Sequence, residues 1–154
     1  PAVSGLLSLH RRQAWGVTGR YGAAQLCGAI AGVLIAHAMF AEGLFQVSAH
    51  VRAGPAQWLS EFVATAGLLG TILRCLRHRP EQLPQSVGLY IMAAYWFTAS
   101  TSFANPAVTI ARMLTDTFAG IAPGGVPGFI GAQLAAVALI WLATRHGPPG
   151  PQAG

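Results

Sequence analysis

Long apolar stretches alternate with short polar segments along most of the chain. An uninterrupted apolar run of about 18 residues or more predicts a helix that spans a membrane. Spans are predicted at about residues 21–40, 56–73, 87–100 and 126–143. The third is short as a purely apolar run and continues into the Thr- and Ser-rich residues 98–102. The pattern predicts an all-α membrane protein.

The tripeptide Asn105-Pro106-Ala107 lies between two of these stretches. Asn is a favoured N-cap and Pro suits the first position of a helix, so a helix is predicted from Pro106 to about Asp116. It would be roughly 16 Å long, about half of a hydrocarbon core near 30 Å thick. The prediction is therefore a half-helix, whose N-terminal N–H groups attract the oxygen of a neutral solute and repel cations.

The first residues of the chain repeat this motif. PAVS at 1–4 matches PAVT at 106–109, and AQL at 24–26 matches AQL at 132–134. A second half-helix is therefore predicted at about residues 1–10. Inverted repeats around broken helices are a known way to build a site at the membrane midplane. The predicted pore motif consists of Pro1 and Ala2 in the first copy and Asn105, Pro106 and Ala107 in the second.

Charge agrees with a membrane setting. Charged residues make up 8% of the chain, against roughly 25% in soluble domains. The net charge of +5 does not indicate nucleic acid, because all nine basic residues are arginines that cluster between apolar stretches. If the Pro106 half-helix is re-entrant, seven of them share one face, predicted to be cytoplasmic: Arg11, Arg12, Arg20, Arg74, Arg77, Arg79 and Arg145. Arg52 and Arg112 fall on the other side. The chain is predicted to be a multi-pass protein of the cell membrane.

Two Asn-Pro-Ala-type half-helices, Gln25 and Gln133 in equivalent spans, and Glu61 in the second span resemble the aquaporin, or major intrinsic protein, family. The resemblance covers residues 1–145 and leaves 146–154 as a Pro- and Gly-rich flexible tail. It implies a right-handed helical bundle in which six spans and two half-helices surround one pore, and a homotetramer of such channels in the intact protein.

Against that pattern the chain is expected to be incomplete. It begins at Pro1, without the first-motif Asn and without the two spans that should precede the first half-helix. It therefore resembles the last two-thirds of an aquaporin. Four spans cannot enclose a six-span pore, so we expect this piece not to conduct alone, and its natural function to be that of the parent protein.

The resemblance also places a selectivity filter. In most family members Arg follows the second Asn-Pro-Ala, but this chain has Val108 there, and Arg112 lies one helical turn later on the same face. A headgroup-facing Arg112 is the alternative. The other filter positions are Ala93 and Ser102. These small side chains imply a wide filter that admits glycerol-sized solutes or neutral metalloids such as arsenous acid, as in bacterial aquaglyceroporin-like relatives associated with arsenic handling.

Three further residues are predicted to support the pore. The resemblance implies that Glu61 accepts hydrogen bonds from the loop before Asn105, which favours a scaffold role over a proton relay. Gln25 and Gln133 are predicted to bridge helices through hydrogen bonds.

The predicted function is passive passage of small neutral solutes across a lipid bilayer. A non-conducting remnant that only associates with other subunits is one alternative. A secondary transporter is another, although its ion coupling needs intramembrane charges and the spans offer only Glu61. The two cysteines and five scattered histidines show no metal or disulfide spacing, and no enzyme motif appears, so neither a cofactor nor enzymatic activity is expected.

Overall fold

The computed structural model of the chain describes residues 1–145, and the tail predicted at 146–154 lies outside them. The described residues form helices joined by loops, without a strand. In chain order the elements are α1 (Ala2–Leu9), α2 (Trp15–Met39), α3 (Pro55–His78), η1 (Pro80–Gln82), α4 (Leu83–Phe97), α5 (Pro106–Arg112), η2 (Pro123–Gly125) and α6 (Val126–Thr144).

Three of these segments are long and apolar enough to cross a membrane: Trp15–Met39, Pro55–His78 and Pro123–Thr144. The third predicted span, at about residues 87–100, corresponds to α4, which has 15 residues. It ends at Phe97, before the Thr- and Ser-rich segment into which the sequence extended it. The all-α membrane class is confirmed.

The long helices also differ from their predicted bounds. Helix α2 begins at Trp15 rather than about Tyr21, so Arg20 lies within the helix. Helix α3 continues to His78 rather than about Leu73, so Arg74 lies within it. Arginine is a good helix former with a long stem that reaches water from near a helix end. An apolar-run criterion therefore stops before the helix does.

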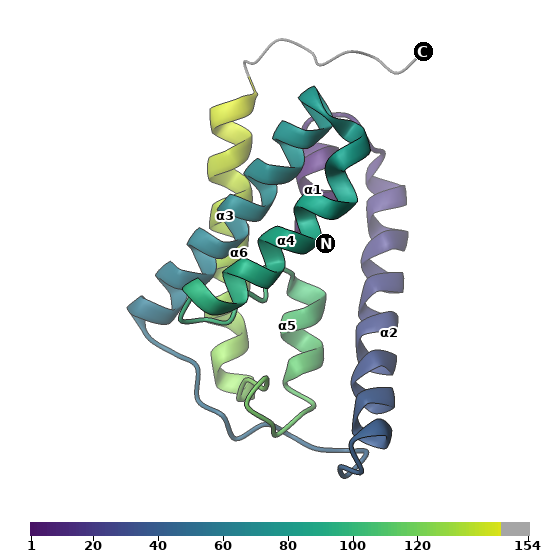
Figure 1. Cartoon of the computed structure of the whole chain (residues 1–154), viewed down its shortest axis with the longest axis vertical. Helices are drawn as coiled ribbons and strands as arrows, with labels where there is room; N and C mark the ends of the chain where they lie inside the picture. The colour runs from purple at the N-terminus through teal and green to yellow at the C-terminus, as the bar shows by residue number, and fades with distance from the viewer. Residues whose placement is uncertain (146–154) are drawn as a thin grey trace.

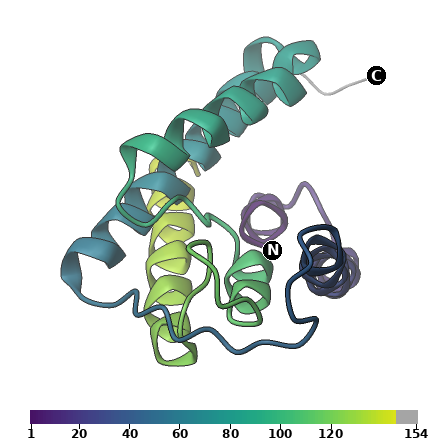
Figure 2. The same ribbon diagram turned by 60° about the horizontal axis from the view of Figure 1, so that its bottom comes forward.

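The two short helices lie one above the other between α2 and α6 (Figure 1). Helix α1 occupies the upper half of the molecule and α5 the lower half, and the N-terminal end of α1 lies next to that of α5 in both views (Figure 2). The α1–α2 and α3–α4 connections and the end of α6 share the upper end. The loops that precede α3 and follow α5 share the lower end.

Helix α3 packs along α6 on one side and α4 on the other. Apolar clusters surround the short helices, one at α1 (Ala2, Leu6, Leu69 and Val137) and one beside α5 (Phe103, Ile121 and Phe129). Five polar side chains are also fully buried, namely Glu61, Thr65, Ser100, Thr109 and Gln133. The interior of the bundle therefore combines apolar clusters with buried hydrogen-bonded side chains.

Candidate functional site

Asn105 starts α5 through its own side chain. It has an extended backbone, and its Oδ1 accepts a hydrogen bond from the amide of Ala107 at 3.0 Å. Pro106 follows at the first helical position, where a missing N–H costs nothing. The helix ends at Arg112 rather than about Asp116, because the amides of Met113 and Leu114 turn back to carbonyls three residues earlier. At about 1.5 Å per residue, α5 is roughly 10 Å long, shorter than predicted.

The side-chain nitrogen of Asn105 points toward α2. Its Nδ2 donates to Oε1 of Gln25 at 3.4 Å, and both side chains are half-buried. The structure thus brings the second motif and Gln25 together. In the first motif, Pro1 precedes α1 and Ala2 is buried beside Leu6 and Leu69.

Glu61, fully buried in α3, holds the loop before Asn105. Its Oε2 accepts from the amide of Phe103 at 3.2 Å and its Oε1 from the amide of Ala104 at 2.5 Å. Oε1 also accepts from Nε2 of Gln133 at 2.7 Å. These three bonds give both carboxylate oxygens a partner, which offsets part of the cost of burying them. Glu61 thus accepts hydrogen bonds from the loop before Asn105, which is the contact that the family resemblance implies.

The backbone of that loop is strained. Thr101, Ser102 and Ala104 have φ values of 58°, 49° and 49°, in the left-handed region that side-chain-bearing residues rarely occupy. Such residues cost on the order of 1 kcal/mol or more each and persist where the surroundings fix them. Glu61 supplies that constraint at one end of the loop. At the other end, the amide of Ser100 donates to Oγ of Ser60 at 3.1 Å.

The structure does not bring all four predicted filter residues together. Val108 is half-buried and packs against the cluster that contains Phe103, and the Arg112 guanidinium lies 4.3 Å from the centre of the Phe103 ring. Ser102 is buried, with an Oγ that has no partner among the described residues. Ala93 is exposed on α4. The structure therefore brings Val108 and Arg112 to the cluster that contains Phe103, and it leaves Ala93 on an exposed surface.

Sequence reasoning gave Arg52 no role beyond its side of the membrane, yet this residue joins two loops near the site. It is buried, and its Nε donates to the carbonyl of Gly120 at 2.8 Å while its Nη2 donates to that of Phe118 at 2.5 Å. Burial lowers the pKa of its guanidinium, although Tyr95 and Glu61 act in the opposite direction. No spacing rule connects a single arginine to carbonyls more than sixty residues away, so the sequence held no signal for these bonds.

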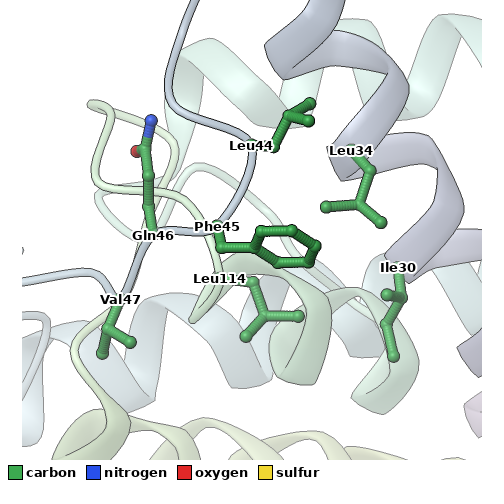
Figure 3. A pocket seen from close by; sticks show the side chains of 7 residues that line it. All are labelled: Ile30, Leu34, Leu44, Phe45, Gln46, Val47 and Leu114. Atoms are coloured by element: carbon green, nitrogen blue, oxygen red, sulfur yellow. The ribbon is translucent and has the colours of Figure 1, made fainter.

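An apolar pocket lies near the lower end of α5. Figure 3 shows its lining side chains from α2, from the loop after α2 and from the segment after α5. They are Ile30, Leu34, Leu44, Phe45, Gln46, Val47 and Leu114. Apart from Gln46 these side chains are all apolar, and the Gln46 amide is already hydrogen-bonded to the Gly43 carbonyl and the Asp116 amide.

The described residues contain no group of three or more His, Cys, Asp or Glu side chains that could hold a metal ion. Cys27 and Cys75 are free thiols.

The chain is 55% identical to the aquaglyceroporin AqpS of Rhizobium meliloti over 134 residues, which is 87% of this chain and 58% of the relative. The chain belongs to the aquaporin, or major intrinsic protein, family. The predicted resemblance is thus confirmed, and the chain spans less than two thirds of the length of this relative. No protein-family model matches the chain, and no solved structure matches it.

Proposed function

We propose that the whole protein is a passive transmembrane channel for small neutral solutes and not an enzyme. The observation that carries this proposal is the meeting of the α1 and α5 N-terminal ends beside the Asn105–Gln25 contact. Helix N-termini and uncharged amides favour solute oxygens and disfavour cations. The relative AqpS is named an aquaglyceroporin, which is a channel class.

The environment of Glu61 supports a passive channel over an ion-coupled transporter. Both carboxylate oxygens already accept hydrogen bonds from Phe103, Ala104 and Gln133. A coupling group needs to exchange protons or ions during transport. Glu61 instead serves as a fixed acceptor that shapes the loop before Asn105.

We further propose that glycerol and arsenous acid are among the solutes. Val108 offers a half-buried apolar side chain where most family members carry Arg, and Ser102 adds a small hydroxyl nearby in the chain. A less polar and wider constriction admits larger neutral solutes than a water-selective one.

The experiment compares solute fluxes in vesicles by stopped-flow light scattering. It uses a chimera in which AqpS supplies the part of its length that this chain does not span, either unmodified or with Val108→Arg. We expect the unmodified chimera to pass glycerol and arsenous acid, and Val108→Arg to reduce both fluxes while water flux persists. Val108→Leu is the matched control, because it changes size slightly and adds no charge. An unmodified chimera that passes no solute would refute the channel proposal.

We also propose that the seven arginines predicted to share one side of the membrane lie on the cytoplasmic side of the cell membrane. The upper connections and the end of α6 lie together, and Arg11, Arg12, Arg79 and Arg145 belong to those segments. A membrane-impermeant thiol reagent should label Arg12→Cys only from the inside and Ala53→Cys only from the outside, in a background without Cys27 and Cys75.

The proposed assembly is a homotetramer. Large apolar side chains are exposed along α2 and α4, among them Tyr21, Ile35, Leu89 and Met92. Such surfaces suit lipid or a second subunit. The mass of the chimera in detergent, measured by light scattering, tests this assembly state.

A further inference from the structure

Two guanidinium groups approach the Phe103 ring. The Cζ atom of Arg112 lies 4.3 Å from the ring centre and that of Arg52 lies 5.6 Å from it. Both distances are within the range of a cation–π contact. Phe103 is buried and its amide is held by Glu61, so the ring is a fixed support for both arginines.

Arg52 is also tied to Arg112 through the backbone. Arg112 is the last residue of α5, and the loop that leaves it returns when the amide of Ile121 donates to the Arg112 carbonyl at 3.2 Å. The two carbonyls that accept from Arg52, those of Phe118 and Gly120, lie just before this return. The forked guanidinium thus closes the loop at the point where it meets the end of α5.

The space around this loop is tight. A Cβ atom on Gly120 would meet the carbonyl oxygen of Thr115 and the hydroxyl of Ser48. The amide of Ser48 in turn donates to the Met113 carbonyl at 2.9 Å. A loop with so little free space transmits a displacement at Gly120 to its neighbours rather than absorbing it.

Arg112 carries a free donor in this arrangement. Its Nη1 is buried and has no partner among the described residues. A buried donor without a partner costs free energy, and the oxygen of water or of a hydroxylated solute would satisfy it. The direction in which Nη1 points therefore matters for which solutes are favoured.

We propose that Arg52 is a positioning residue for Arg112: it closes the loop after α5 and shares the Phe103 ring, which fixes Arg112 and its free donor and thereby sets the balance between polyol and water passage at this end of the solute path. The inference rests on the proposed channel function and names a specificity determinant outside the predicted filter. The guanidinium fork is the required feature, because a lysine ammonium keeps the charge but cannot donate to both carbonyls in the same planar geometry.

The test measures the ratio of glycerol to water permeability in vesicles that contain the AqpS chimera. The variants are Arg52→Gln, Arg52→Lys, Arg112→Gln and the double variant Arg52→Gln/Arg112→Gln. Arg145→Gln is the matched control, because Arg145 lies 5.5 Å from the centre of the Trp141 ring at the other end of the molecule. Folded protein is quantified by size-exclusion chromatography before reconstitution. If Arg52 variants do not fold, Phe103→Leu takes their place, because it removes the shared ring and keeps an apolar side chain.

We expect Arg52→Gln and Arg52→Lys to change the ratio about two- to fivefold, the range that one cation–π contact corresponds to, and Arg145→Gln to leave it unchanged. Adding Arg52→Gln to Arg112→Gln should produce no further change, because coupled residues are not additive. Phe103→Leu should change the ratio in the same direction as the Arg52 variants. A normal ratio in Arg52→Lys, or additive effects in the double variant, would overturn the inference while the channel function stands. An unmodified chimera that passes no glycerol overturns both.

Discussion

Nε2 of Gln133 lies 2.7 Å from Oε1 of Glu61, and both side chains are fully buried. The same Nε2 lies 2.8 Å from Oγ1 of Thr109, which donates to the carbonyl of Asn105 at 3.0 Å. One amide therefore links α3 and α6 to the start of α5. Together with the bonds from Glu61 to the preceding loop, this network fixes the position of a helix that is too short to be stable alone.

Glu61→Gln is expected to destabilise the protein. A side-chain amide has one acceptor oxygen where the carboxylate has two, so at least one of the Phe103 and Ala104 amides would face an NH₂ group. We expect a loss of about 2 kcal/mol, or an apparent Tm lower by about 4–8 °C, in a thermal unfolding measurement in detergent. Glu81→Gln, at an exposed position in η1, is the control and should leave Tm unchanged. Equal Tm values for the two variants would show that Glu61 does not hold the loop.

Asn105 allows its capping and solute-facing roles to be separated. Asn105→Asp keeps the acceptor for the Ala107 amide and suits a helix N-terminus, whereas Asn105→Ala removes the cap. We expect Asn105→Ala to cost about 1 kcal/mol of stability and Asn105→Asp to cost less than half of that. Both variants lose the Nδ2 donor that faces Gln25, so both should lower glycerol flux in the chimera. Normal glycerol flux in a folded Asn105→Asp variant would show that Nδ2 does not contribute to solute passage.

The start of α5 could be predicted from the sequence, because Asn105 and Pro106 act on their own helix. Its end could not, because the turn at Met113 depends on a bond between the Met113 carbonyl and the amide of Ser48, a residue of a distant loop. The all-α class and the family could likewise be predicted, because apolar runs and repeated motifs can be read directly from the sequence.

Only part of the candidate site could be predicted from the sequence. The pairing of Glu61 with the loop before Asn105 came from the family resemblance and not from spacing. The contacts of Arg52 with Phe118 and Gly120 follow from packing between loops far apart in the chain, for which periodicity offers no signal. Two positions with left-handed backbone hold Thr101 and Ala104 rather than glycine or asparagine, so the sequence gives no sign of this conformation.

Gly67 is predicted to be required at the contact between α3 and α4. A Cβ atom there would lie 2.8 Å from Cζ of Tyr90, whose hydroxyl donates to the Ala64 carbonyl at 2.9 Å. Gly67→Ala should therefore lower stability by about 1–3 kcal/mol, because the ring has to move and its hydrogen bond weakens. Gly70→Ala is the matched control on the same helix. It meets nothing within 4 Å and should be neutral or stabilise α3 by up to about 1 kcal/mol in the same unfolding assay. If Gly67→Ala is as stable as Gly70→Ala, α4 is not in close contact with α3 at this point.

His10 is predicted to make the α1–α6 contact sensitive to acid. Its Nε2 lies 3.0 Å from Oγ1 of Thr144, and that hydroxyl donates to the Ile140 carbonyl, so the imidazole nitrogen is the donor. Burial and, to a lesser extent, the charge of Arg12 lower the pKa of His10 below its ordinary value. The unfolded chain then binds a proton more readily than the folded one. Stability should therefore fall as the pH drops through the usual histidine range.

The measurement for this effect is the apparent Tm between about pH 8 and pH 5, compared with His10→Gln. Glutamine keeps a side-chain N–H donor for Thr144 but has no proton to gain. The Tm of the wild type should fall relative to that of His10→Gln as the pH drops, and effects of pH that do not involve His10 are common to both proteins and cancel in this difference. A difference that stays constant over this range would mean that His10 titrates alike in the folded and unfolded chains, and that its contact with Thr144 does not depend on charge.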